Sequence, residues 1–304
     1  MKLAVSAFSA VLLLALPGHL AGCKRAPSPS TPETVFKRDI LCVIYPVADI
    51  VRQVAGEKAD VQWRIQWFCE NGSDPRDLNL TDDRKRSVHD ADLVITSGFP
   101  ERWAGDMLDP QERAQRVIAL DALSSRQKFS DVHGDLWLDP YVVMDLTEAV
   151  RQRLSIHDDR REVYYRQQAD AYVKQLKELD GDFARRLAPF KGRRFLALRP
   201  TWMAMAKRYG LEEIAPVDTT PQKLTDDEVQ LLQQTAKDSG TNILAVEASV
   251  LPGVKRELQL RTGLTLLPMD SLGTSASDGR STYIRIMRYN LDQLVQDFGT
   301  ADKR

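Results

Sequence analysis

The sequence predicts an α/β protein of two lobes, each a mainly parallel sheet flanked by helices, joined by one long spanning helix. Short apolar runs alternate with amphipathic stretches from residue 39 onward, and a second alternation of the same kind begins near residue 193. Between them, residues 158–188 keep a helical apolar pattern without proline and with one glycine, Gly181. Alternation of strands and helices favours parallel sheets with helices on their faces.

The first alternation predicts an N-terminal lobe over residues 38–157. The expected strands are residues 40–45, 61–68, 92–98 and 116–120, and the expected helices are residues 47–54 and 82–89. Thr81 is placed to cap the second helix, and Asp82 and Asp83 in its first turn suit the helix dipole.

The second alternation predicts a C-terminal lobe over residues 190–304. The expected strands are residues 193–198, 242–247 and 264–270, with helices over residues 202–209 and 254–262 and a further helix opening at residue 225. Thr225 and Glu228 form a capping-box pattern there. The two halves are alike in kind, but they show no sequence repeat.

Residues 158–189 are predicted to form the linking helix. Its apolar positions recur at helical spacing, which indicates packing against a core and no chemistry of their own: Tyr165, Ala169, Tyr172, Leu176, Leu179, Phe183 and Leu187. Two α/β lobes joined in this way leave a cleft where the carboxyl ends of the strands face each other, which is the usual ligand position in open α/β sheets.

The composition narrows the class of function. The 304 residues include 42 Lys+Arg and 43 Asp+Glu, a net charge of −1, whereas nucleic-acid binders usually carry a basic excess. We therefore expect no nucleic-acid partner. No nucleophile elbow, Walker loop, dinucleotide-binding glycine fingerprint or His-Glu-x-x-His motif occurs, so we predict that the protein is not an enzyme and holds no resident cofactor.

The first 22 residues are predicted to be an export signal, with Lys2 followed by an apolar stretch from Ala4 to Leu16. Leu20-Ala21-Gly22-Cys23 resembles the bacterial lipoprotein box, in which the cysteine becomes the lipidated first residue. The alternative is a leader cut by ordinary signal peptidase. Residues 23–37, rich in proline and serine, are predicted to tether the fold to the membrane through Cys23.

Cys42 and Cys69 remain as an even pair in an oxidising compartment, so they could form a disulfide. Both lie in or at the end of predicted strands, and two buried thiols are the alternative.

Seven stretches, in order along the mature chain, resemble the extracytoplasmic solute-binding proteins of ABC importers for zinc and manganese. They are YPVADIVRQVAG (45–56), GSDPRDLNLT (72–81), DADLVITSG (90–98), DLWLDP (135–140), AKRYGL (206–211), MDSLG (269–273) and YIRIMRYNLDQL (283–294). The resemblance implies two lobes spanned by one rigid helix, little lobe closure on binding, and an ABC permease and ATPase as partners. It also implies zinc or manganese as cargo.

The resemblance implies a metal site of three histidines and one carboxylate, but three of the matching positions differ. Arg76 follows Asp74-Pro75 where the family has histidine, Asp135 precedes Trp137 at the second histidine position, and Arg199 falls at the third. Only the acid is kept, as Asp270. A shifted register would bring His133 near the site.

Arginine stays protonated and has no lone pair for a metal, so Arg76, Asp135, Arg199 and Asp270 together would form a neutral cleft. Three arrangements follow from these residues. The four residues could form an internal salt-bridge cluster that holds the lobes together. The arginines could clamp a carboxylate or an oxyanion. Alternatively, the arginines could point outward, leaving an oxygen-rich metal site that favours manganese, formed from Asp135, Asp270, Asp77, Glu247 or His133.

From the sequence we expect a monomeric, membrane-anchored, extracytoplasmic solute-binding component of a zinc/manganese-type ABC importer. The alternative is a surface lipoprotein derived from that family, which binds an anionic or zwitterionic small ligand or serves in adhesion without transport.

Overall fold

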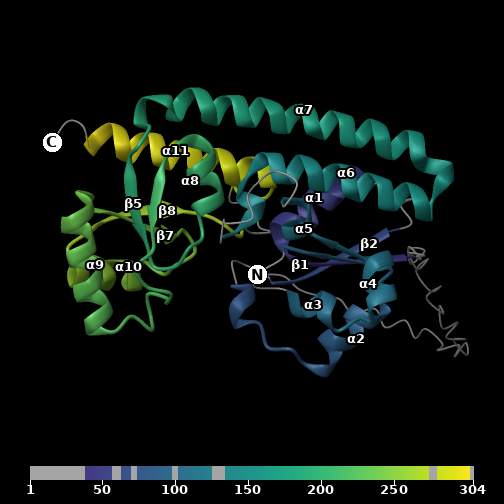
Figure 1. Cartoon of the computed structure of the whole chain (residues 1–304), viewed down its shortest axis with the longest axis horizontal. Helices are drawn as coiled ribbons and strands as arrows, with labels where there is room; N and C mark the ends of the chain where they lie inside the picture. Colours follow the sequence, from purple (N-terminus) through teal and green to yellow (C-terminus); the bar gives the residue numbers. More distant parts are fainter. Residues whose placement is uncertain are drawn as a thin grey trace, which may run out of the picture. The chain divides into compact units, whose positions relative to one another are not determined.

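Two parallel sheets, each of four strands, carry the fold of the described residues (Figure 1). The structure is a computed structural model that describes residues 38–56, 63–69, 74–97, 102–124, 134–273 and 279–301, so the predicted signal, Cys23 and tether lie outside it. Strand order is β2-β1-β3-β4 in the first sheet and β6-β5-β7-β8 in the second. The strands are β1 Arg38–Ile44, β2 Trp63–Cys69, β3 Leu93–Thr96, β4 Val117–Ala119, β5 Arg194–Ala197, β6 Glu212–Ile214, β7 Ile243–Glu247 and β8 Thr265–Met269.

Helices connect and cover the strands. They are α1 Tyr45–Ala55, α2 Asp82–Asp90, α3 Arg102–Asp106, α4 Pro110–Arg116, α5 Leu120–Ser124, α6 Pro140–His157, α7 Glu162–Leu187, α8 Met203–Tyr209, α9 Asp226–Ser239, α10 Pro252–Thr262 and α11 Tyr283–Ala301. Short 3₁₀ turns occur at η1 Pro75–Asp77, η3 Leu136–Leu138, η4 Asp159–Arg161 and η5 Ala188–Phe190. We call the first sheet with its helices the N-terminal lobe and the second sheet with its helices the C-terminal lobe.

The predicted two-lobed α/β class is confirmed, and so are the predicted helix starts. Thr81 accepts a hydrogen bond from the Arg84 amide at the start of α2, and Thr225 and Glu228 form the expected capping box at α9. Each cap satisfies an amide that the helix itself leaves unbonded.

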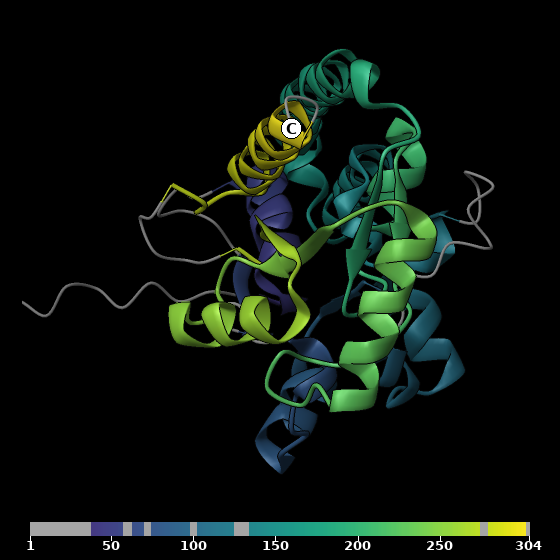
Figure 2. The ribbon, with the colours of Figure 1, turned by 90° about the vertical axis from the view of Figure 1, so that its left-hand side faces the viewer.

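The strands of the second sheet alternate between two apolar layers. Phe195 and Ala245 face the main core, which also contains residues of α8, α11 and α7, whereas Leu196 and Leu244 face a smaller cluster formed with α9 and α10. Since neighbouring residues of a strand point to opposite faces, this sheet is covered on both sides. Figure 2 separates α11, in yellow, from α9 and α10, in green shades.

Two kinds of element were not predicted. Strand β6 is three residues long and reads Glu-Glu-Ile, so it gives neither alternation nor an apolar run. Helices α3 to α6 were left unassigned, although α4 begins with the capping box of Asp109 and Glu112.

The linking helix is confirmed as α7, and each of the seven predicted apolar positions along it is buried. The helix begins at Glu162 and ends at Leu187, with 3₁₀ turns η4 and η5 at its two ends. It packs against α1 and α6 of the N-terminal lobe and against α8 and α11 of the C-terminal lobe (Figure 1). Its 26 residues correspond to about 39 Å, enough to contact both lobes.

Cys42 and Cys69 are buried and are not bridged to each other. In the parallel register, Cys42 lies opposite Trp67 and Cys69 opposite Ile44. A two-residue offset between neighbouring strands separates the two Cα atoms by about 8 Å, beyond the reach of a disulfide. The structure thus has the second of the two alternatives, buried thiols.

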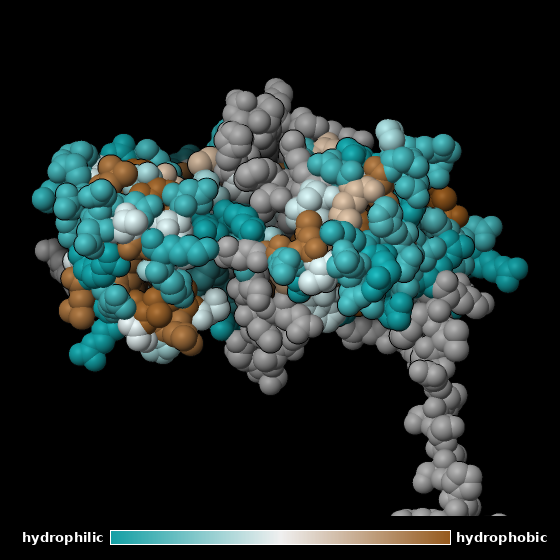
Figure 3. All heavy atoms as spheres, turned by 90° about the horizontal axis from the view of Figure 1, so that it is seen from below, coloured by the Kyte–Doolittle hydropathy of each residue, from teal (hydrophilic) through white to brown (hydrophobic). Residues whose placement is uncertain are grey.

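The face of the molecule shown in Figure 3 is mostly hydrophilic, with hydrophobic patches chiefly over the C-terminal lobe. Within the described residues, no helix combines the length and the apolar character that crossing a membrane requires.

We expect Leu176→Ala in the middle of α7 to lower the free energy of unfolding by about 2–5 kcal/mol, because the side chain is fully buried between the lobes and its loss leaves a cavity. Chemical denaturation measures this change. Lys177→Ala is the matched control, since its exposed side chain should change stability by about 0.5 kcal/mol or less. Equal effects of the two substitutions would contradict the core role of this stripe.

Candidate functional site

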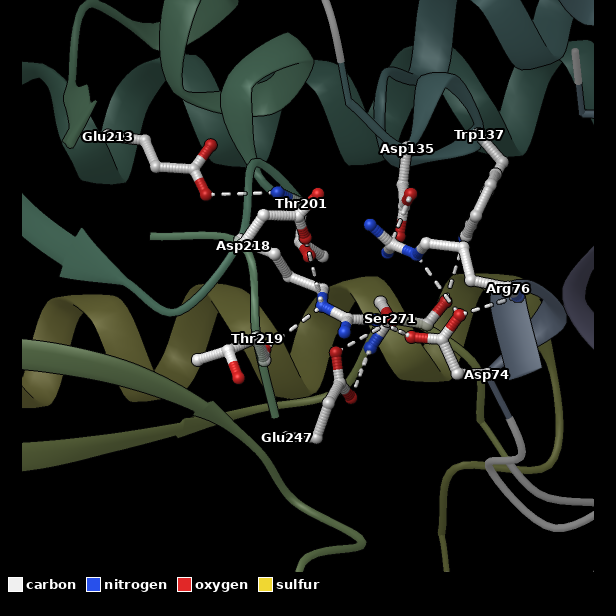
Figure 4. A network of polar contacts seen from close by, with 11 residues as sticks. Asp74, Arg76, Asp135, Trp137, Thr201, Glu213, Asp218, Thr219, Glu247 and Ser271 are labelled. Atoms are coloured by element: carbon white, nitrogen blue, oxygen red, sulfur yellow. Dashed lines mark hydrogen bonds and ion pairs between the residues drawn. The ribbon is translucent and has the colours of Figure 1, made fainter. Parts of the chain in front are cut away.

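Polar residues from both lobes meet at the carboxyl ends of the strands. Asp74 and Arg76 follow β2, Asp135 precedes η3, Arg199 follows β5, and Glu247 ends β7. Figure 4 shows their side chains and the contacts that join them. The site therefore lies where the topology of parallel sheets places ligands.

Asp74 is the centre of this group. Its carboxylate caps η1 by accepting from the Arg76 amide at 2.8 Å, and the same oxygen accepts from Arg76 Nε at 3.0 Å. Its other oxygen accepts from Nη1 of Arg199 in the C-terminal lobe. One carboxylate thus pairs with both predicted arginines and joins the two lobes.

Asp135 faces Arg76 from the loop before η3 (Figure 4). Its Oδ1 lies 3.7 Å from Arg76 Nη2, and its side chain is only 5% exposed. The Asp135 amide donates to the Thr201 carbonyl at 3.0 Å, which is a second contact between the lobes. Burial alone lowers the pKa of Arg76, but the carboxylates of Asp135 and Asp74 outweigh burial and raise it. Arg76 therefore stays charged.

Asp270 does not line the cavity and pairs with a different arginine. Its Oδ1 accepts from the amides of Leu272 at 3.1 Å and Gly273 at 2.7 Å, and its Oδ2 pairs with Arg280 Nη1 at 3.0 Å. The Asn290 side chain bonds both the amide and the carbonyl of Asp270. Asp270 thus fixes the loop after β8.

Glu247 lies in the C-terminal wall of the site. It accepts from the Ser271 hydroxyl at 2.7 Å and from the Ser271 amide at 3.1 Å. Burial raises the pKa of Glu247 to about 7, because it disfavours the charged form more than the bonds from Ser271 favour it. Glu247 is thus divided between its neutral and charged forms near neutral pH.

Glu213, behind the site, has a similarly shifted pKa. Its Oε1 accepts from the Thr201 amide at 3.0 Å, and its buried Oε2 has no hydrogen-bond partner within the described chain. Burial raises the pKa of Glu213 to about 7. Because Thr201 also accepts from Asp135, Glu213 supports the contact between the lobes.

A cavity of about 280 Å³ opens beside these residues and is lined by both lobes. Asp74, Arg76 and Asp135 form its N-terminal wall, and Arg199, Glu247 and Ser271 lie on the other side. Asp270 is not among the lining residues. Of the residues singled out in the sequence, Arg76, Asp135, Arg199 and Glu247 therefore line this cavity.

The structure places the predicted residues in three groups. Arg76, Asp135 and Arg199 come together as an ion-pair cluster around Asp74. Asp270 pairs with Arg280 instead. Cys23, His133 and the side chain of Asp77 lie outside the described residues.

Asp74 and Glu213 were missed from the sequence. Asp74 could have been found, because an aspartate before Pro-Arg is a capping residue that leaves a second oxygen for another donor. The sequence gives no comparable signal for Glu213, whose pKa depends on burial beneath α8.

The carboxylates of the cleft do not form a ready metal site. In the described part of the chain, no group of three or more His, Cys, Asp and Glu side chains is close enough to hold a metal ion. Asp74 pairs with two guanidiniums and Asp135 faces one, so a dication would meet two fixed positive charges.

Two α/β lobes, one long helix across both, and a polar cavity between the strand ends define a two-lobed solute-binding protein. The family model for the zinc-uptake complex component A, periplasmic (ZnuA), matches residues 40–297. The chain belongs to this family, the solute-binding proteins of zinc-type ABC importers.

Two curated relatives show how similar the chain is to known members. The zinc-binding lipoprotein AdcA of Streptococcus pneumoniae is 24% identical over 284 residues, which cover 86% of this chain. The chain spans only 56% of the length of AdcA. The iron-binding protein YfeA of Yersinia pestis is 22% identical over 310 residues and is covered over 96% of its length.

Solved structures show the same fold. The periplasmic zinc-binding protein TroA from Treponema pallidum superposes with a TM-score of 0.71 at 18% identity, over 86% of this chain and 98% of TroA. Zn(II)-bound AdcA from Streptococcus pneumoniae superposes with a TM-score of 0.70 at 21% identity, over 86% of this chain and 57% of AdcA.

We expect a double-mutant cycle of Asp74→Ala and Arg199→Ala to show a coupling energy of about 1–3 kcal/mol, because this charge-assisted hydrogen bond is largely shielded from water. Urea unfolding of the four proteins measures it. The exposed pair of Arg194 and Glu212 is the control, with an expected coupling below about 1 kcal/mol. A coupling at the control level for Asp74 and Arg199 would contradict an interlobe tie.

We expect the titration of Glu213 to lower the free energy of unfolding as pH rises. Between its ordinary pKa of 4.5 and the raised pKa of about 7, the unfolded chain has lost the proton while the folded chain keeps it. Stability contributed by the neutral form is therefore lost over this interval, by an amount on the order of 3 kcal/mol.

Glu213→Gln should make this slope shallower and leave the part that Glu247 contributes, whereas Glu212→Gln on the same strand, exposed at its surface, should keep the whole slope. Unfolding free energies measured at pH 4.5, 6 and 8 test the difference. Parallel pH profiles for wild type and Glu213→Gln would show that Glu213 does not titrate in this range.

Proposed function

We propose that this protein is the extracytoplasmic solute-binding component of an ABC importer, held at a membrane by a lipid on Cys23, and that it captures its solute in the interlobe cavity. The observation that carries the proposal is a cavity lined by both lobes at the strand ends, in a chain of the zinc-uptake family. AdcA, itself named a lipoprotein, supports the anchor.

The mechanism follows from the contacts between the lobes. Trp137 Nε1 donates to the Ser271 carbonyl at 2.7 Å, and Tyr45 Oη donates to the Ser281 carbonyl at 2.6 Å. The Tyr283 amide donates to Asp49 at 2.7 Å. These buried or half-buried bonds join the lobes beneath α7. Binding is therefore expected to reorder side chains and loops around the cavity, with little rigid closure.

The identity of the captured solute is a separate question from the role of the protein in an ABC importer. A second candidate, capture of zinc or manganese, is favoured by the names of the relatives, and here Asp135 and Glu247 would have to supply the oxygen ligands. Arg76 and Arg199 oppose that candidate, because they already compensate the carboxylates and repel a dication.

The role is tested without knowing the cargo. The purified protein should bind saturably to the nanodisc-embedded permease and ATPase of the zinc-type importer from the same cell, because solute-binding components dock on their permease. Microscale thermophoresis measures this binding, and an unrelated two-lobed binding protein is the control. Binding no stronger than that of the control would contradict the proposed role.

A further inference from the structure

The interlobe cavity is built for an occupant larger than a single ion. Its volume of about 280 Å³ lies just below the range of about 300–1,000 Å³ that is typical of small-molecule sites. Its lining combines hydroxyl groups, such as those of Thr201 and Ser271, with apolar side chains, such as those of Trp202 and Leu251. A small organic molecule with polar and apolar parts fits this lining.

Both arginines keep donors that the protein does not use. Arg199 donates through Nε to the Thr219 carbonyl at 3.2 Å and through Nη1 to Asp74, and Nη2 has no hydrogen-bond partner within the described residues. Arg76 donates through Nε to Asp74, while its Nη2 lies 3.7 Å from Asp135, beyond hydrogen-bond distance. Nη1 of Arg76 likewise has no partner in the described chain.

These unused donors belong to partly buried side chains. The Arg76 side chain is 21% exposed and the Arg199 side chain is 16% exposed, and both line the cavity. A ligand acceptor that meets these charged donors gains a charge-assisted hydrogen bond. Carboxylates are the acceptors that match a guanidinium best.

The net charge of the site favours a zwitterionic ligand over a simple anion. Arg76 and Arg199 are already balanced by Asp74 and Asp135, and Asp218 lies 3.7 Å from Arg199 Nε on the solvent side. A phosphate or a simple carboxylate would leave the cleft with excess negative charge. A zwitterion brings its own ammonium group, and Asp135 and Glu247 place carboxylates, which are acceptors, in the cavity wall.

We propose that the cavity binds a small zwitterion of the α-amino-acid class, with its carboxylate on Arg76 and Arg199 and its ammonium group on Asp135 or Glu247. This inference rests on the proposed function, since the ligand would be the solute that the importer receives. The apolar part of the lining, including Trp202 and Leu251, would contact the side chain of the amino acid.

Isothermal titration calorimetry on the purified, dialysed protein tests the proposal. The probes are the twenty L-amino acids, zinc chloride, manganese chloride, inorganic phosphate, and, for each amino acid that binds, the amine that lacks its carboxylate. We expect at least one amino acid to bind with a stoichiometry of one. Its amine should bind at least about 100-fold more weakly, because the bidentate contact is lost.

Substitutions of the cavity arginines test whether the amino acid binds in the cavity. Arg76→Gln and Arg199→Gln should each weaken amino-acid binding at least about tenfold. Arg199→Lys should also weaken it, because lysine lacks the planar fork. Arg194→Gln, on the exposed edge of the second sheet, should bind as wild type does. Circular dichroism melts confirm that each variant is folded.

Three results would overturn the proposal: no binding of any amino acid, binding unchanged in both Gln variants, or stoichiometric zinc or manganese binding that amino acids do not displace. Measuring binding to the permease distinguishes failure of the proposed ligand class from failure of the proposed role in import. Docking without amino-acid binding refutes the ligand class alone, and amino-acid binding without docking refutes the role in import.

Discussion

The continuous apolar core beneath α7 is the constraint on which the cleft depends. Residues of the first sheet such as Val94, of the second sheet such as Phe195, and of α7 such as Leu176 belong to one buried cluster. Opening the lobes would expose that surface at about 25 cal/mol per Å², far more than one small ligand could offset over a large area. The positions of the two walls of the cavity are therefore set before any ligand arrives.

Within that fixed frame, the ion pairs decide what the cleft can bind. Burying charges is costly unless each is compensated, and here Asp74 serves both arginines from one capped turn. In this arrangement Asp74 and Asp135 balance the charges of Arg76 and Arg199, and the side chains join the lobes. It also occupies the carboxylates that a cation would need, so membership in a zinc-uptake family does not by itself transfer the cargo of its relatives.

The sequence predicted the elements that have strong local signals. The helical stripe of α7 and the caps at Thr81 and Thr225 could be recognised because spacing and cap chemistry are local properties. The pairing of Arg199 with Asp74 could not, because it joins residues 125 positions apart and depends on the orientation of one loop. The burial that shifts the pKa of Glu213, and the capture of Asp270 by Arg280, likewise arise only from tertiary packing.

A neutral site with unused donors gains selectivity from the need to satisfy every group at once. A lone anion fills the free guanidinium ends but adds uncompensated charge beside Asp135 and Glu247. A lone cation meets carboxylates that Arg76 and Arg199 already compensate. The proposed zwitterion would pair with these donors and add no net charge to the cleft. On the proposed assignment, guanidiniums at the positions where the family has imidazoles would change the class of ligand, while the fold and its interlobe packing stay the same.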